Sequence, residues 1–302
     1  MLPQTSTKIT FPGGSIAEDA TLLFCKAAPG DATKILLFSD VTPFHPLDYN
    51  WPDQPGDKGR LLFDGKVISI IDCLTAAFNP NSAELLLDQE IKVRKIKRDD
   101  ANWLFLVAHV IKRENLTEFD LAKLSDKKIK LEVDANYRLA LSRSHTASHF
   151  AAVALNKICA RFWQKKSLRL DSLDNPDFDG SAIVSSRITE ECSTDQYHCG
   201  KSLRKLGFDC NAFFVANELK QIESEINKQL VEWCFFGLTI SMTPAIANLN
   251  QKRIWSCILP DGKTATIPCG GTHVLQTLPG DKVVISLQTS GEQDFVITSQ
   301  MV

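Results

Sequence analysis

Two short motifs contain three of the six histidines in this 302-residue chain. In the run SRSHTASHF, His145 and His149 are four residues apart, a spacing that places both imidazoles on one face of a helix, one turn apart. In the run IPCGGTHV, Cys269 and His273 are also four residues apart, with two glycines between them. Adjacent glycines permit a tight turn that brings a thiolate and an imidazole together. The four side chains are therefore candidate ligands for one metal ion.

A single thiolate with three imidazoles is a ligand set that suits Zn²⁺, so we predict zinc as the cofactor. In this set Cys269 is expected to act as a thiolate ligand and not as an attacking nucleophile. Four tight protein ligands would make the zinc structural, whereas a long or absent fourth bond would leave a position for water or substrate. The spacing of the motifs leaves both arrangements open.

The segments that must position these motifs differ between the two halves of the chain. Residues 1–130 contain short apolar runs separated by turn residues, and Asp64-Gly65 between two such runs predicts a hairpin. We predict that residues 1–130 form a small β-barrel domain, and a sandwich is the alternative. The expected strands are Lys34–Phe38, Leu61–Phe63, Lys66–Asp72, Glu90–Ile96 and Trp103–Ile111.

From residue 131 to residue 302 the sequence predicts a second domain, with the metal site on a long helix and a glycine turn. Apolar residues four apart predict one long helix, or two abutting ones, over residues 136–166. A second amphipathic helix is expected to turn Leu219, Ile222, Ile226 and Leu230 inward and Glu223 outward. The predicted fold class is thus α+β. Further strands are expected at Ser181–Ile188, Thr264–Ile267, Lys282–Leu287 and Asp294–Thr298.

Composition limits the environment and the partners of the chain. Hydrophobic residues make up 44% and charged residues 23%, and the formal net charge is -2. A globular protein of this charge has no global basic field for nucleic acid, so any RNA contact must come from local clusters. No apolar stretch reaches the length of a membrane span, and no secretory signal begins the sequence, so we expect a cytoplasmic protein. Nine irregularly spaced cysteines are expected to be reduced and mostly packed as small apolar side chains.

The two metal motifs resemble those of a known family. His145–His149 reads HTASH, which is similar to the HTATH motif of the editing domain of alanyl-tRNA synthetases and of the free-standing AlaX proteins. Cys269–Val274 reads CGGTHV, which is identical to the second motif of that domain. The resemblance extends over most of the chain from about residue 35 onward, and it includes Gln54-Pro55-Gly56-Asp57 in the first half.

This resemblance implies a trans-editing hydrolase that deacylates mischarged tRNA(Ala), with serine and then glycine as the amino acids removed. It further implies that Gln54 and Thr272 act in the editing site as hydrogen-bond partners of the amino acid. One loop departs from the family, because Leu47–Asp53 is longer and lacks the glycine run found there. The bulk of Tyr49 and Trp51 in this loop is expected to alter substrate choice.

The implied partner is tRNA, with neither DNA nor a membrane. Four local clusters of basic residues are the candidate contacts, and the cluster from Arg161 to Arg169 is favoured because it follows the histidine helix. The four clusters are Lys92, Arg94, Lys95, Lys97 and Arg98; Lys127, Lys128 and Lys130; Arg161, Lys165, Lys166 and Arg169; and Lys201, Arg204 and Lys205.

Two other functions are compatible with the same ligands. The chain could be a non-catalytic tRNA-binding module in which the zinc is structural. It could also be a metallohydrolase of a different small ester or amide.

Overall fold

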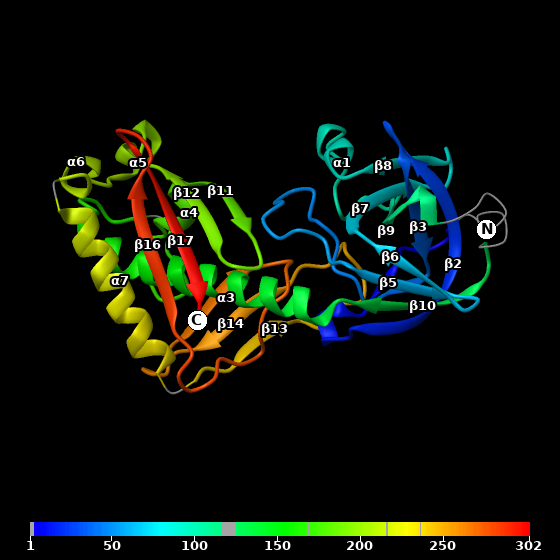
Figure 1. Ribbon diagram of the computed structural model, residues 1–302. Helices are drawn as coiled ribbons and strands as arrows, with labels where there is room; N and C mark the ends of the chain where they lie inside the picture. The colour runs from blue at the N-terminus through cyan, green and yellow to red at the C-terminus, as the bar shows by residue number, and fades with distance from the viewer. Residues whose placement is uncertain (1–2, 116–124, 168, 216, 236) are drawn as a thin grey trace. The chain divides into compact units, whose positions relative to one another are not determined.

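The chain folds into two compact units, traced in the computed structural model of Figure 1, which describes residues 3–115, 125–167, 169–215, 217–235 and 237–302. The first unit comprises Met1–Arg138 and Pro244–Arg253, and the second comprises Leu139–Thr243 and Ile254–Val302. The boundary expected at residues 130/131 thus lies near the observed one. Nothing in the sequence indicated that ten residues of the second half would return to the first unit.

The segment Pro244–Arg253 is held in the first unit by hydrogen bonds to its backbone carbonyl groups. The Ile9 amide donates to the Ala247 carbonyl over 2.8 Å, and the Arg98 guanidinium donates to the Leu249 carbonyl over 2.6 Å. Leu249 is buried in the core of this unit.

An eight-stranded antiparallel sheet forms the framework of the first unit, in the order β6-β5-β10-β2-β3-β9-β7-β8. A short parallel pair, β1 (Lys8–Ile9) with β4 (Val41–Thr42), accompanies it. Asp64 and Gly65 both adopt positive φ between β5 and β6, which confirms the expected hairpin. The strands are β2 (Ala17–Ala28), β3 (Asp31–Ser39), β5 (Gly59–Phe63), β6 (Lys66–Ile70), β7 (Asp72–Asn79), β8 (Glu84–Leu87), β9 (Leu104–Lys112) and β10 (Lys128–Val133).

The prediction of a small closed barrel in residues 1–130 is wrong, because the edge strands β6 and β8 do not pair with each other among the described residues. One hydrogen bond, from the Ile71 amide to the Val110 carbonyl at 2.9 Å, joins the end of β6 to β9, but no ladder follows it. Both faces of β3 carry apolar clusters: Leu37 packs in one and Phe38 in the other. The sheet thus buries apolar side chains on its two sides.

The strand expected at Glu90–Ile96 is also wrong, because α1 (Gln89–Val93) occupies that place. Alternation would have put Ile91 and Val93 on the same buried face. Instead Ile91 is fully buried and Val93 is 78% exposed. The Glu90 carboxylate accepts a hydrogen bond from the Leu87 amide at 2.8 Å, which ties the first turn of the helix to the strand before it.

The second unit is built around the long helix α3 (Ala135–Cys159), whose first residues belong to the first unit. Asp134 caps the helix, since its Oδ1 accepts hydrogen bonds from the amides of Asn136 and Tyr137 at 3.1 and 3.0 Å. The helix was expected to reach residue 166. It stops earlier, passing through the 3-10 turn Ala160–Phe162 before Trp163 becomes extended.

Two antiparallel sheets pack with α3 and α7 (Glu218–Cys234) around one large core. One has the order β11-β12-β17-β16 and the other β13-β14-β15. None of the helices in the described part of the chain has the length and apolar character that crossing a membrane requires. The strands are β11 (Ile183–Ile188), β12 (Ser193–His198), β13 (Ile240–Thr243), β14 (Ile254–Ile258), β15 (Thr264–Pro268), β16 (Val283–Thr289) and β17 (Asp294–Met301), and the short helices are α4 (Asp179–Ala182), α5 (Lys201–Leu206) and α6 (Cys210–Phe213).

Helix α7 contacts β16 through polar side chains as well as apolar ones. Ile222, Ile226 and Leu230 are buried as expected. Glu223, however, is half-buried: its carboxylate accepts a hydrogen bond from the Leu287 amide at 2.6 Å. Asn227 exchanges two hydrogen bonds with the backbone of Ile285, at 2.8 and 3.0 Å. The polar residues of this helix thus fix its position along the strand.

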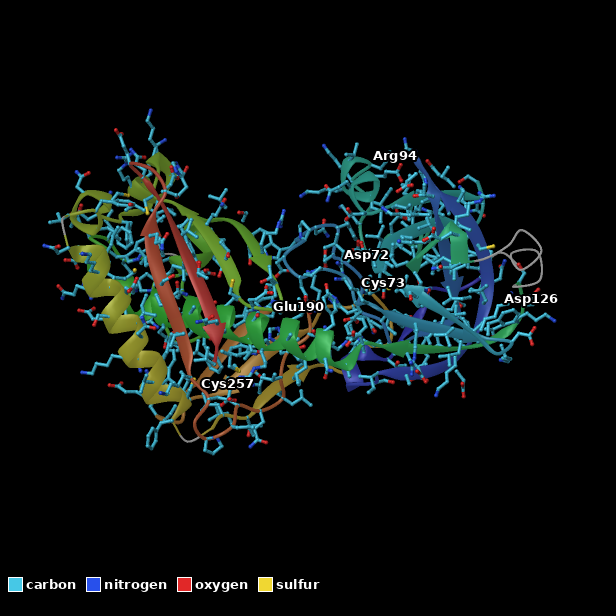
Figure 2. The ribbon with its side chains drawn as sticks, in the orientation of Figure 1. Asp72, Cys73, Arg94, Asp126, Glu190 and Cys257 are labelled. Carbon is cyan, nitrogen blue, oxygen red and sulfur yellow. The ribbon has the colours of Figure 1, made fainter. Side chains whose placement is uncertain are left out.

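None of the nine cysteines forms a disulfide bond, and six of them are buried. Figure 2 labels Cys73 on β7 and Cys257 on β14. Burial raises the pKa of both thiols. They behave as small apolar side chains, as the sequence predicted.

His109 on β9 is a buried histidine of the first unit, only 1% exposed. Its Nδ1 is 3.1 Å from the Leu37 carbonyl oxygen and must donate to it, so its Nε2 accepts from the Thr42 hydroxyl at 2.8 Å. Burial lowers the pKa of His109 from 6.5 to about 4. The folded protein therefore holds this imidazole neutral.

We predict an acid-sensitive contribution of His109 to stability. Its unfolded pKa of 6.5 exceeds its folded pKa of about 4, so the unfolded state binds the additional proton between these values. The contribution of the neutral imidazole to the free energy of unfolding is fully present above pH 6.5. It is lost as the pH decreases toward 4, a loss of about 2–3 kcal/mol. Urea unfolding of the wild type and His109→Gln at about pH 7.5 and about pH 4.5 measures this. The same pH dependence in both proteins would contradict the prediction.

Candidate metal centre

Four side chains predicted as metal ligands converge in the second unit. One ligand atom from each of His145, His149, Cys269 and His273 lies within 4.8 Å of the other three. Both histidines of the first motif project from α3, while the cysteine and the last histidine lie on the turn that follows β15. Segments far apart in the sequence thus form one cluster, and this cluster could hold a metal ion.

The cysteine sulfur lies among nitrogen atoms. Cys269 Sγ is 3.2 Å from His273 Nε2 and 3.5 Å from His145 Nε2. The Gly271 amide donates to the same sulfur at 3.3 Å. An amide hydrogen bond stabilises a thiolate, which is the form of cysteine that binds metals.

His149 is held neutral by an apolar wall. Its ring packs edge-on against the indole of Trp255 on β14, with centroids 5.0 Å apart. Burial lowers its pKa from 6.5 to about 3. Among the described residues its Nδ1 is buried with no hydrogen-bond partner. Metals bind the neutral form of imidazole, so this environment favours a ligand over a charged histidine.

The donor set fits a divalent ion that accepts sulfur and nitrogen ligands. Three imidazoles and one thiol, close together and at least half-buried, have the composition of tetrahedral thiolate and imidazole sites.

The two residues expected to bind the amino acid lie in different units. Thr272 is next to the cluster and is buried, and its Oγ1 is 2.8 Å from Ser142 Oγ. Gln54 belongs to the first unit and is also buried. Their catalytic roles stay predictions.

The loop Leu47–Asp53, which differs in sequence from the editing family, buries one of its two aromatic residues and exposes the other. Tyr49 is 1% exposed and stacks with Phe105 in the core of the first unit, whereas Trp51 is 42% exposed. Only Trp51 therefore adds bulk at the surface of that unit.

Sequence reasoning missed Ser142 and Trp255, which both adjoin the cluster. Ser142 lies three residues before His145 on α3, so its hydroxyl was predictable as a neighbour of the first motif. Trp255 carried no local signal, because its proximity to His149 depends on how β14 packs against the helix.

The favoured basic cluster is half neutralised, because its two arginines are paired with carboxylates. Arg161 pairs with Glu218 at 2.9 Å and also with Glu225, and Arg169 pairs with Asp177 at 2.5 Å. By contrast, within the described residues no ion pair involves five exposed cations of the second unit. These are Lys165, Lys166, Lys201, Arg204 and Lys205.

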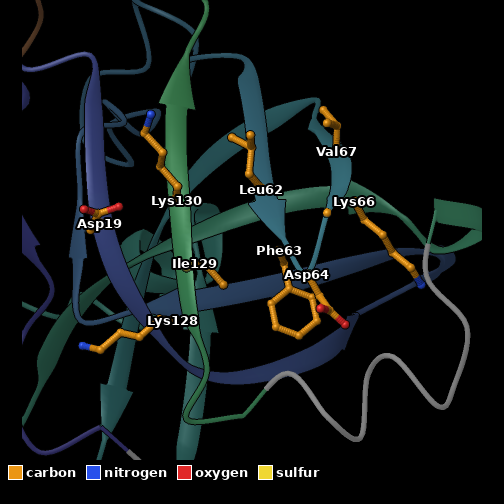
Figure 3. A pocket seen from close by; sticks show the side chains of 10 residues that line it. Asp19, Leu62, Phe63, Asp64, Lys66, Val67, Lys128, Ile129 and Lys130 are labelled. Atoms are coloured by element: carbon orange, nitrogen blue, oxygen red, sulfur yellow. The ribbon is translucent and has the colours of Figure 1, made fainter.

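A separate pocket of about 600 Å³ opens on the first unit beside β5, β6 and β10 (Figure 3). Three lysines line it together with two aspartates and the ring of Phe63. Lys130 is paired with Glu132 at 2.7 Å, and Lys128 donates to the Thr21 hydroxyl at 2.9 Å. Its mixed charge favours no single class of ligand.

No protein-family model matches the chain, and no curated protein matches it at a significant level. The likeness to the alanyl-tRNA editing family therefore depends on the short motifs and on the site they form.

We predict that the second unit binds about one metal ion per chain and that this requires the α3 pair. Protein dialysed against zinc and then against buffer should retain the ion in native mass spectrometry. The double variant His145→Ala, His149→Ala should lose it. His198→Ala is the matched control, because His198 is exposed and pairs with Asp294 outside the cluster. Equal zinc in the double variant would disprove the assignment of ligands.

Proposed function

We propose that this chain is a zinc-dependent hydrolase that removes serine, and to a lesser extent glycine, from mischarged tRNA(Ala). The observation that carries the proposal is the convergence of the two motifs, HTASH and CGGTHV, into one cluster of ligand atoms. Both motifs resemble those of the AlaX group, and the cluster has the donor atoms that zinc prefers.

Hydrolysis of this ester requires few catalytic groups from the protein. An aminoacyl-tRNA ester is already activated, so hydrolysis needs a positioned water and stabilisation of developing negative charge. A bound zinc ion would supply Lewis-acid polarisation at this site. The role of Cys269 is that of a thiolate ligand, since its sulfur already faces two imidazole nitrogens and an amide.

Selectivity for serine is the demanding part. A site that hydrogen-bonds a substrate hydroxyl can reject the analogue that lacks it by up to roughly 10⁴-fold. Thr272, which precedes the ligand His273 directly, is our candidate for this contact. Glycine differs from alanine by one methyl group, so discrimination there is limited to about 10-fold to 200-fold.

For the tRNA, we propose contacts with the exposed cations of α5 and of residues 165–166. Two backbone links hold these segments together, since the Gln164 amide donates to the Gly207 carbonyl over 2.8 Å and Trp163 bridges to Phe208. Lysines that have no carboxylate partner among the described residues are available to phosphates, whereas Arg161 and Arg169 are already paired.

A second candidate is a non-catalytic RNA-binding module with a structural zinc. The full set of four protein ligands favours it, because four ligands fill a tetrahedral zinc and leave no position for water.

We predict metal-dependent deacylation of Ser-tRNA(Ala). Zinc-loaded protein should hydrolyse the serine ester faster than the alanine ester by about 100-fold or more. The double variant His145→Ala, His149→Ala should lose at least about 100-fold of the serine activity, because Lewis-acid stabilisation contributes several kcal/mol. Release of labelled amino acid from Ser-, Gly- and Ala-tRNA(Ala) measures both effects.

Two outcomes would overturn the proposal. Intact esters with stoichiometric zinc and tight tRNA binding would favour the structural module. Intact esters without tRNA binding at low salt would favour a hydrolase of a different small ester or amide.

A further inference from the structure

The glycine turn is joined to α3 by two hydroxyl groups besides the metal ligands. Thr146 follows His145 directly and is fully buried. Its Oγ1 lies 3.2 Å from His273 Nδ1, and the Val274 amide donates to the same oxygen at 3.3 Å. One side chain of the helix therefore contacts two successive residues of the turn.

The donors and acceptors around Thr146 and His273 determine where the ring proton of His273 lies. A threonine hydroxyl has two lone pairs and one proton, and the Val274 amide uses one lone pair. The opposite nitrogen of His273, Nε2, faces the cluster, 3.2 Å from Cys269 Sγ. If Nε2 is the ligand, the proton of the neutral ring must reside on Nδ1. Thr146 Oγ1 then accepts that proton with its second lone pair.

A second hydroxyl contact lies one helical turn earlier. Ser142 and Thr146 are four residues apart, so they share a face of α3. Ser142 Oγ is 2.8 Å from Thr272 Oγ1, and both side chains are buried. The helix thus fastens Thr272 and His273 in succession. Ser148 differs, because its hydroxyl donates to the His145 carbonyl within the helix itself.

We propose that Thr146 is a positioning residue that fixes His273 in the tautomer with the proton on Nδ1 and turns its Nε2 toward the metal. A partner on the non-ligating nitrogen sets the ring orientation and the ligand basicity of a metal-bound histidine. This inference rests on the metal site of the proposed function. It assigns the threonine of the HTASH run a role separate from that of the two histidines.

The first test compares zinc dissociation constants, measured by competition with a chromophoric chelator. Thr146→Val has nearly the same shape without the hydroxyl and should weaken binding by about 10-fold to 100-fold. Thr146→Ser keeps the hydroxyl and should stay within about threefold of the wild type. Wild-type affinity in Thr146→Val would overturn the inference.

Thr277→Val is the matched control for a general loss of stability. Thr277 is equally buried in the second unit, and its hydroxyl also accepts a backbone hydrogen bond, from the Leu238 amide at 2.8 Å. Both valine variants should lower the melting temperature, but only Thr146→Val should weaken zinc binding. Equal weakening in both would mean that Thr146 acts through stability alone, and the inference would fall.

The second test reads the tautomer directly by NMR of ¹⁵N-histidine protein, with and without zinc. His273 should show a protonated Nδ1 in the wild type and in Thr146→Ser, and a mixture of tautomers in metal-free Thr146→Val. A wild-type proton on Nε2 would overturn the inference whatever the activity. If the wild type bound no metal, the proposed function would fail as well, whereas equal affinities in wild type and Thr146→Val would remove only this inference.

Discussion

The ligand cluster depends on burying both imidazoles of α3 and on holding that of His149 without charge. His145 is 1% exposed and His149 is 8% exposed, in a helix whose next turn enters the apolar core through Phe150 and Ala154. An imidazolium at His149 would be removed from solvent, which is why the pKa of His149 is low. The packing that stabilises the helix therefore also keeps His149 in the neutral form that binds metals.

The opposite side of the cluster is set by the small sheet β13-β14-β15. Trp255 pairs with Ile267 in its ladder, so the strand that ends just before Cys269 is registered against the indole that contacts His149. The turn then brings Cys269 and His273 to the helix, where hydroxyl groups hold it. The cluster is thus constrained by a helix, a sheet and a turn, and the parts of them that form it lie in the second unit.

The start of α3 is fixed by a different interaction, inside the first unit. Arg138 is paired with the fully buried Asp57, with Nε 3.1 and 3.2 Å from the carboxylate oxygens. It also donates to the carbonyls of Ser15 and Pro43. Removing one partner of such a pair costs about 3–5 kcal/mol, because a buried charge is left without compensation. The first residues of the histidine helix are therefore anchored by the β-rich unit.

The sequence by itself determined the features that depend on local spacing. The four-residue intervals of His145 with His149 and of Cys269 with His273, the hairpin at Asp64-Gly65 and the buried face of α7 all follow from periodicity and turn chemistry. Only the tertiary structure decided what depends on contacts between distant segments. These are the open sheet, the return of Pro244–Arg253 to the first unit, and the places of Trp255, Ser142 and Thr146 beside the ligands. The helix α1 at Gln89–Val93 was likewise decided by the tertiary structure. Ile91 is buried and Val93 is exposed because of the strands around them, and the order of the residues does not encode this difference.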